Sequence, residues 1–292
     1  MLKPVLDIGV PALVILTMVA VGLGLTVADF RRVVSKPGLV AAATAGQMVC
    51  LPLIALVLVR SLGLSPPVEK GMLLVAACPA GSLANLYGHL ARANVALSVS
   101  LTTVSSLAAL VTMPALMMGF RAYLGETATF IVPIPAILGQ LLLTLILPIL
   151  TGMAIRRGWP ATTERHRSGL FALSLGELAA LIGLVVAQEA GHFAAELGEI
   201  ALAVTLLTGL ALAAGWATGW AGGDPTDRFT VGLVFVVRNV GVATAVAVTV
   251  LGRLEFAVFA TAYFLCQAPL LLTAALLHRN SRTAAPGLNT AG

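Results

Sequence analysis

The sequence has little charge and few aromatic residues for its length. Of its 292 residues, 10% are Asp, Glu, Lys or Arg, 5% are Phe, Trp or Tyr and 59% are hydrophobic, with a mean hydropathy of +1.01. A soluble domain usually has about 25% charged residues. The scarcity of charge therefore excludes a soluble globule and predicts an all-α polytopic membrane protein.

Clustered cysteines and catalytic motifs are also missing. Cys50, Cys78 and Cys266 are far apart within apolar stretches, so neither a disulfide framework nor a metal site is predicted. A hydrolase elbow, a phosphate loop, HExxH and a dinucleotide fingerprint are all absent, which predicts no enzyme and no cofactor. The net charge of +5 comes without a basic run interleaved with aromatics, and this argues against nucleic acid as a partner.

Long apolar runs account for most of the chain. A helix needs about 20 apolar residues to cross the hydrocarbon core of a bilayer. Nine segments meet this requirement, so we predict nine transmembrane helices, of which the third and eighth contain an internal break. Their predicted limits are 6–27, 38–60, 67–90, 93–119, 129–155, 168–189, 198–221, 228–251 and 254–278.

Basic residues are unevenly divided between the predicted loops. Eleven lie after spans one, three, five and seven or in the C-terminal tail, and five lie on the other side of the membrane. Short cytoplasmic loops carry the excess of Lys and Arg in membrane proteins. The N-terminus is therefore predicted outside and the C-terminus in the cytoplasm.

A polar segment, 156–167, divides the chain near its middle and is predicted to be a cytoplasmic connection. Residues 1–155 form a first repeat plus a joining span, and 168–278 form a second repeat. The interrupted span is the third of four in each repeat, and the joining span gives the two repeats opposite orientations, which is typical of inverted-repeat transporters. Residues 279–292 are predicted to be a disordered tail.

The two breaks are the candidate ligand site. Segment 78–85 contains a proline, a glycine and an amide, and segment 236–243 contains Arg238, an amide and a glycine. Non-helical backbone at membrane depth is tolerated only within protein or beside a water-filled cavity. Arg238 lies near the bilayer midplane, where it indicates an anion-binding or counter-ion residue. The alternative is a structural arginine that pairs with freed carbonyls or with Glu177.

Other polar residues within the spans could join the same site. Asn85 and Asn239 occupy similar places in the two breaks, where an amide can bind a ligand or cap a half-helix. Ser98 and Thr102 share one face of span four, although hydroxyls in such helices also bond to their own carbonyls. Gln47 is the sole strong polar group in the middle of span two. The two amides, the two hydroxyls and the arginine are predicted to line one cavity.

These motifs resemble those of the bile acid:sodium symporter family, whose crossing helices carry Pro-Gly-Gly-x-x-Ser-Asn and then Leu-Ala-x-Gly-(Asp/Asn)-x-Ala-Leu-Ser-x-x-x-Thr. The matching stretches here are 79–85 and 90–102. The resemblance covers nearly the whole chain in outline. It implies two crossing broken helices, a core domain of spans two, three, four, seven, eight and nine, and a panel domain of spans one, five and six. It also implies a secondary transporter in a bacterial inner, cytoplasmic membrane.

The sequence departs from the family at the positions that the resemblance implies for sodium ligands. The family's second element is Glu-x-Gly-x-Gln-Asn, and aligning its Asn on Asn239 places Val234 at the Glu and Arg238 at the Gln. The Ser of the first element is replaced by Ala84. A family site with one carboxylate and two bound sodium ions has a net charge of +1. In this chain the neutral Val234 and the positive Arg238 give the same net charge of +1 without any bound ion. Arg238 is therefore predicted to stand in for the ion-loaded state.

We expect a transporter of a small organic anion, with Arg238, Asn85 and Asn239 as substrate-binding residues. The two replaced ligands argue against sodium coupling. Two alternatives are a sodium-coupled symporter with a rearranged site and a non-transporting membrane receptor or scaffold. The ion-site positions implied by the family are Gln47, Asn85, Ser98, Thr102 and Arg238.

Overall fold

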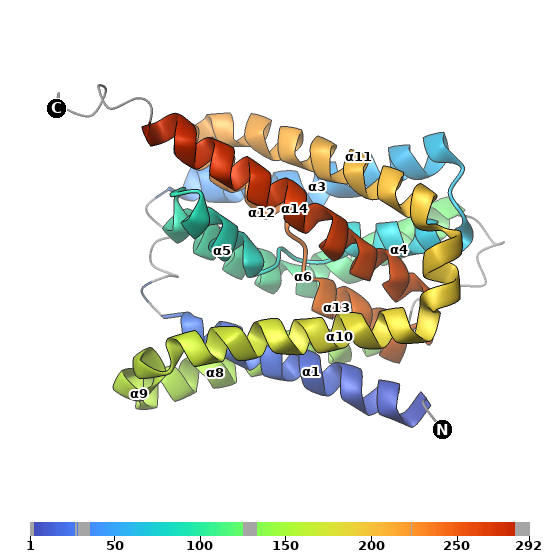
Figure 1. The fold of residues 1–292 in the computed structure, drawn as a ribbon, viewed down its shortest axis with the longest axis horizontal. Helices are drawn as coiled ribbons and strands as arrows, with labels where there is room; N and C mark the ends of the chain where they lie inside the picture. The colour runs from blue at the N-terminus through green and yellow to red at the C-terminus, as the bar shows by residue number, and fades with distance from the viewer. Residues whose placement is uncertain (1–2, 27, 29–35, 125–132, 223, 284–292) are drawn as a thin grey trace.

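The computed structural model describes residues 3–26, 28, 36–124, 133–222 and 224–283, and its regular elements are all helical, as predicted. Figure 1 shows their arrangement. The elements are α1 (Lys3–Gly24), α3 (Pro37–Leu62), α4 (Pro66–Ala77), α5 (Leu83–Leu90), α6 (Val95–Leu124), α7 (Ile134–Leu141), the π-helix η2 (Leu142–Ile146), α8 (Leu147–Gly158), α9 (Pro160–Arg165), α10 (Arg167–Ala195), α11 (Leu197–Thr218), the 3-10 helix η3 (Gly219–Gly222), α12 (Pro225–Val236), α13 (Val240–Ala245), the π-helix η4 (Val246–Val250) and α14 (Glu255–Thr283).

The helices have the length and surface of an integral membrane protein. Within the described ranges, five are long and apolar enough to cross a bilayer: Pro37–Leu62, Val95–Tyr123, Ile134–Gly158, Leu197–Gly222 and Glu255–Ser281. Many large apolar side chains point outward instead of into the core; Val111, for example, is 75% exposed. Such a surface suits lipid better than water. The nine spans and the inverted repeats stay predictions.

The helices form two groups, which lie above and below one another in Figure 1. We call α3–α6 together with α11–α14 the crossing bundle, and α1, α8 and α10 the lower layer. Helix α1 packs along both α8 and α10, and the lower layer meets the bundle through contacts of α1 with α13 and of α10 with α14. The start of α1 and the end of α14 lie at opposite ends of the molecule, and α9 lies at the same end as the end of α14.

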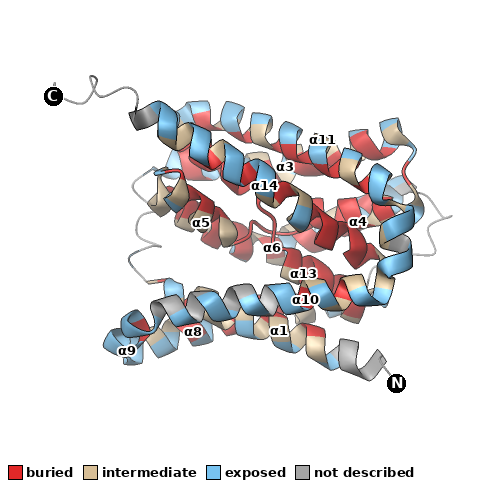
Figure 2. Cartoon of the chain, in the orientation of Figure 1, coloured by how far each residue is buried: buried red, intermediate tan, exposed pale blue. Residues whose placement is uncertain are grey.

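Two helices are interrupted where the sequence predicts. Helix α4 ends at Ala77 because Pro79 has no N–H to donate and forces the preceding Cys78 into an extended conformation, with φ −68° and ψ 155°. In the second half, α12 ends at Val236 and α13 begins at Val240. Both interruptions lie inside the molecule, where Figure 2 shows mostly buried residues.

Two segments predicted to be polar or disordered are more helical than expected. In the predicted connection 156–167, α8 continues to Gly158 and α9 follows after a single residue. Helix α14 continues to Thr283, so residues 279–283 are helical and not a disordered tail. This end of α14 is held in place because the His278 ring stacks on Phe229 with the ring centroids 4.1 Å apart. Residues 284–292 lie outside the described residues.

Candidate functional site at the crossing of the interrupted helices

The two interruptions bind each other. Ala80 and Arg238 form a short antiparallel bridge, in which the N–H of Gly81 donates to the carbonyl of Val237 at 2.8 Å. This pairing satisfies backbone groups that lipid could not. The bridge requires a glycine at position 81, because a Cβ there would lie 2.7 Å from the carbonyl oxygen of Arg238. The crossing is therefore a fixed point from which the neighbouring side chains project.

The side chain of Arg238 is held by oxygen atoms from two other helices. Its Nη1 donates to Oε1 of Gln47 on α3 at 3.0 Å, and its Nη2 donates to the carbonyl of Cys78 at the end of α4. Only 5% of the residue is exposed. Both acceptors are neutral, so they bind Nη1 and Nη2 without neutralising the positive charge, and Nε is buried with no hydrogen-bond partner among the described residues. The side chain of Glu177, the acidic partner considered above, lies outside the described residues.

Two further side chains complete the hydrogen bonding around the crossing. The hydroxyl of Ser105 on α6 accepts from the N–H of Ala80 at 2.9 Å and donates to Oε1 of Gln47 at 3.5 Å. The hydroxyl of Tyr263 on α14 donates to the carbonyl of Val236 at 2.6 Å. Sequence analysis did not assign these roles. Tyr263 is the one tyrosine of span nine and lies near its middle, which is the signal that could have indicated the second role.

Asn85 and Ser98 form a separate pair on α5 and α6. The Ser98 hydroxyl donates to Oδ1 of Asn85 at 2.7 Å, so the structure brings these two predicted residues together. Thr102 donates instead to the carbonyl of Val99 in its own helix at 3.0 Å, which is the ordinary role of a membrane-helix hydroxyl. The hydrogen bonds thus divide the predicted residues into two groups, Arg238 with Gln47 and Asn85 with Ser98. Whether they line one cavity stays a prediction.

Asn239 lies where the crossing bundle meets the lower layer. Its backbone N–H donates to the carbonyl of Pro79 at 2.9 Å, and its Oδ1 accepts from the N–H of Val242 at 3.1 Å, which caps α13. Its Nδ2 faces the sulfur of Met18 on α1 at 3.6 Å. A thioether is a weak acceptor. The Oδ1 of Asn239 therefore caps α13, while its Nδ2 donates only to a weak acceptor among the described residues. The side chain can thus serve both as a helix cap and as a ligand donor, the two roles considered for this residue.

A second polar cluster, which sequence analysis missed, lies at the start of α12. The fully buried Asp227 pairs with Lys36 at 2.5 Å and accepts from Nδ2 of Asn94 at 2.8 Å. The backbone N–H of Asn94 donates to the hydroxyl of Thr230 at 3.0 Å. These bonds tie the start of α3 and the α5–α6 connection to the first turn of α12. The cluster therefore holds the crossing bundle together away from the crossing itself.

Comparison with known proteins gives a consistent group of relatives. A model of the Sodium Bile acid symporter family matches residues 11–196, which include the first interruption but not Arg238. The "Probable sodium/metabolite cotransporter BASS2, chloroplastic" of Oryza sativa subsp. japonica is 30% identical over 202 residues, covering 68% of this chain and 46% of the relative. The uncharacterized sodium-dependent transporter YocS of Bacillus subtilis is 30% identical over 184 residues, covering 61% and 54%.

More distant animal proteins belong to the same group. The ileal sodium/bile acid cotransporter of Homo sapiens is 25% identical over 190 residues, which cover 65% of this chain and 53% of the relative. The chain spans about half the length of the curated relatives it matches. The names of these relatives describe transporters and not enzymes.

Proposed function

Because the chain belongs to the sodium bile acid symporter family, we propose that it is a secondary transporter of a small organic anion. Its relatives include sodium/bile acid and sodium/metabolite cotransporters. The observation that carries the proposal is the pairing of two interrupted helices around a buried, charged Arg238. Interrupted helices with an intramembrane charge are the usual substrate and ion sites of secondary transporters.

We assign the crossing bundle to the core domain of the transporter and the lower layer, with α7 and η2, to the panel. In this assignment the chain crosses the membrane nine times as two inverted repeats, with its N-terminus outside and its C-terminus in the cytoplasm. The start of α1 and the end of α14 lie at opposite ends of the molecule in Figure 1, which supports an odd number of crossings. Cysteines introduced into 156–167 should resist membrane-impermeant maleimides in intact cells; efficient labelling from outside would reverse the orientation.

The second part of the proposal is that Arg238 takes the place of a coupling cation. Carbonyls at the ends of broken helices, together with side-chain oxygens, are the usual ligands of sodium in such transporters. Here an oxygen of each kind, the carbonyl of Cys78 and Oε1 of Gln47, accepts from the guanidinium. The C-terminus of α4 also carries a partial negative charge that favours a cation. Val234 offers no carboxylate to neutralise the arginine, so in this proposal the site keeps a charge of +1.

This charge suits an anionic substrate bound between the two domains. Asn239 is at that boundary, and among the described residues the acceptor of its Nδ2 is the sulfur of Met18. A carboxylate or sulfonate would be a much stronger acceptor than a thioether. We therefore assign Asn239 a direct hydrogen bond to the anion and Arg238 an electrostatic attraction through the crossing, with Asn85 on the opposite half-helix.

The rival function is sodium-coupled symport through a rearranged site. It is favoured by the Asn85–Ser98 pair, which offers two neutral oxygens 2.7 Å apart on residues that match family ligand positions. A sodium ion at that pair would lie in the field of Arg238. For a separation of about 10 Å and an effective dielectric constant of about 20, the repulsion is roughly 1.7 kcal/mol, or about 17-fold in sodium affinity. This cost favours transport without sodium.

Uptake into proteoliposomes tests the proposal. Radiolabelled organic anions, including cholate and short keto acids, would be presented with either sodium or potassium outside, at equal ionic strength and zero membrane potential. We expect saturable uptake of at least one anion at the same rate in both salts. Uptake that occurs only with sodium would favour the rival function, and the absence of uptake and of binding for every anion tested would reject a transporter of organic anions.

A further inference from the structure

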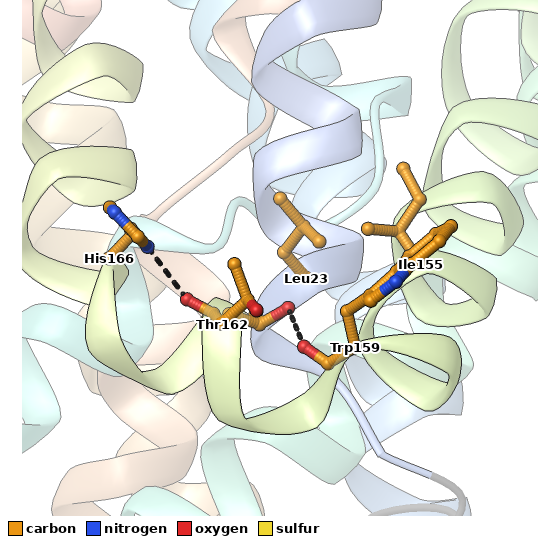
Figure 3. A pocket seen from close by; sticks show the side chains of 6 residues that line it. Leu23, Ile155, Trp159, Thr162 and His166 are labelled. Carbon is orange, nitrogen blue, oxygen red and sulfur yellow. Dashed lines mark hydrogen bonds between the residues drawn. The ribbon is translucent and has the colours of Figure 1, made fainter.

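A crevice lies between α1, α8 and α9, away from the crossing (Figure 3). Its volume is about 230 Å³. The lining residues come from α8, α9 and the last turn of α1, so the crevice is at the end of the molecule where α14 also ends. Its lining residues are Leu23, Ile155, Trp159, Thr162, Thr163 and His166.

The lining is mostly apolar because the polar groups of α9 bond within their own turn. The hydroxyl of Thr163 donates to the carbonyl of Trp159 at 3.0 Å, and a hydrogen bond of 2.9 Å joins Nδ1 of His166 to the carbonyl of Thr162. Trp159 is 64% exposed and stands at the rim of the crevice. Tryptophan is enriched at the membrane–water interface, where its ring lies at the level of the lipid headgroups. The crevice therefore has the composition of an interfacial site.

An exposed apolar stripe leads along the same helix toward the crevice. Leu143, Leu147 and Leu150 are 59%, 50% and 53% exposed. Their spacing of four and three residues places them on one face of η2 and α8. Ile155, which lines the crevice, lies eight residues after Leu147 on the same helix. A lipid acyl chain could lie along the stripe with its polar end at the crevice.

Positive charge is concentrated at the end of this stripe. Segment 156–167 contains four arginines and one glutamate, a net charge of +3 with histidine neutral. Arg156 is used structurally, because its Nη1 donates to the carbonyls of Leu23 and Gly24 at 3.0 and 2.9 Å. Arg157 at the end of α8 and Arg165 at the end of α9 are exposed. Arg157 is two residues from both Ile155 and Trp159, and Arg165 is next to His166, so each arginine is close in sequence to residues that line the crevice.

From the crevice, the apolar stripe and the two exposed arginines together, we propose that this surface binds an anionic phospholipid of the surrounding bilayer. The acyl chain packs on the leucine stripe, the glycerol region enters the crevice beside Trp159, and the phosphate lies near Arg157 and Arg165. A free phosphate would make no use of the stripe, and a zwitterionic lipid would gain less from the arginines. Basic pockets between membrane helices are known to select anionic headgroups in this way.

Trp159 allows the occupant to be tested directly. The chain has three tryptophans, and replacing Trp216 and Trp220 with Phe leaves Trp159 as the sole indole. Phenylalanine at position 220 keeps an aromatic ring for the Arg228 guanidinium, which lies 3.5 Å from the indole centroid. In liposomes, brominated phosphatidylglycerol should quench Trp159 at a mole fraction about fivefold or more below that needed with brominated phosphatidylcholine, because a single nearby arginine favours an anionic lipid by about 1 kcal/mol.

Variants separate the two parts of the site. Arg157→Gln with Arg165→Gln should make the two brominated lipids equally effective, whereas the matched pair Arg121→Gln with Arg253→Gln, which removes two exposed arginines elsewhere, should keep the preference. Thr162→Phe fills the crevice and should reduce quenching by both lipids. Inorganic phosphate at millimolar concentration should not displace the brominated lipid. Equal quenching by the two lipids in the single-tryptophan protein, or displacement by phosphate, would overturn the proposal.

Discussion

Replacing Arg238 with glutamine tests the central part of the proposed mechanism. Glutamine can still donate one hydrogen bond to Gln47 or to the Cys78 carbonyl, so the variant removes the charge while keeping part of the network. If the bound anion lies about 8 Å from the guanidinium in a site of effective dielectric constant about 20, their attraction is roughly 2 kcal/mol. This corresponds to about 30-fold in affinity. We therefore expect the dissociation constant of the anion to rise by about that factor.

The same substitution should create a dependence on sodium. Without the guanidinium, Oε1 of Gln47 and the carbonyl of Cys78 lose their charged donor and can coordinate a cation, and the new glutamine offers a third oxygen. Calorimetric titration of the anion at fixed ionic strength, with sodium exchanged for potassium, should show equal affinity in the two salts for the parent protein. In Arg238→Gln the affinity in sodium should exceed that in potassium.

Arg238→Lys separates charge from geometry. Lysine keeps the positive charge but is a point donor that cannot reproduce the forked bond to Gln47 and Cys78. Most of the anion affinity should therefore survive in the lysine variant, provided that its thermal unfolding temperature stays near that of the parent. Parent binding that strengthens severalfold in sodium, or Arg238→Gln binding as tightly as the parent, would refute the reasoning and leave Arg238 a structural residue.

Two further substitutions probe the crossing. Gly81→Ala should destabilise the protein by about 1–3 kcal/mol, because its Cβ would lie 2.7 Å from a carbonyl oxygen. The control, Gly88→Ala, should not lower the unfolding temperature, because the nearest atom to its Cβ is 3.9 Å away. Equal unfolding temperatures for the two variants would contradict this prediction. Combining Ala84→Ser, Val234→Glu and Arg238→Gln should restore sodium-dependent anion binding, whereas Val234→Glu alone should pair with the arginine and weaken binding in either salt. Sodium-independent binding by the triple variant would count against the assignment of these positions.

The interruptions could be predicted because their causes are local. Pro79 removes a backbone donor and Gly81 permits a close backbone contact, and both are visible as helix breakers inside an apolar run. Arg238 is equally visible, because a charged residue in an apolar span is costly and needs a reason. The sequence also placed Asn239 at the start of a half-helix, and its side chain does cap α13.

The partners of these residues could not be predicted, because they come from distant parts of the chain. Gln47 and Arg238 are 191 positions apart, and Met18 and Asn239 are 221 apart. Helical periodicity gives the face on which a side chain lies, but not which helix packs against that face. The same limit explains why the buried Asp227 was missed, since its partners Lys36 and Asn94 belong to other elements.

A fixed arginine also changes the charge that moves in each transport cycle. A symporter that carries two sodium ions with one monovalent anion moves a net charge of +1, so an inside-negative potential drives uptake. If Arg238 supplies the positive charge, it returns with the empty protein, and only the charge of −1 on the substrate crosses. A potential of 100 mV is worth about 2.3 kcal/mol per charge, so an inside-negative membrane would favour efflux by about 50-fold at equilibrium.

The sign of this effect can be measured in proteoliposomes. A potassium gradient with valinomycin sets the potential, and uptake of a monovalent anion that the protein binds is followed in sodium-free buffer. We expect an inside-negative potential to slow uptake and an inside-positive potential to accelerate it, since no bound ion compensates the charge of the substrate. Faster uptake at an inside-negative potential would mean that cations accompany the anion. Uptake that ignores the potential would mean that one positive charge, such as a proton, crosses with each anion, and either result would show that Arg238 does not replace the coupling ions.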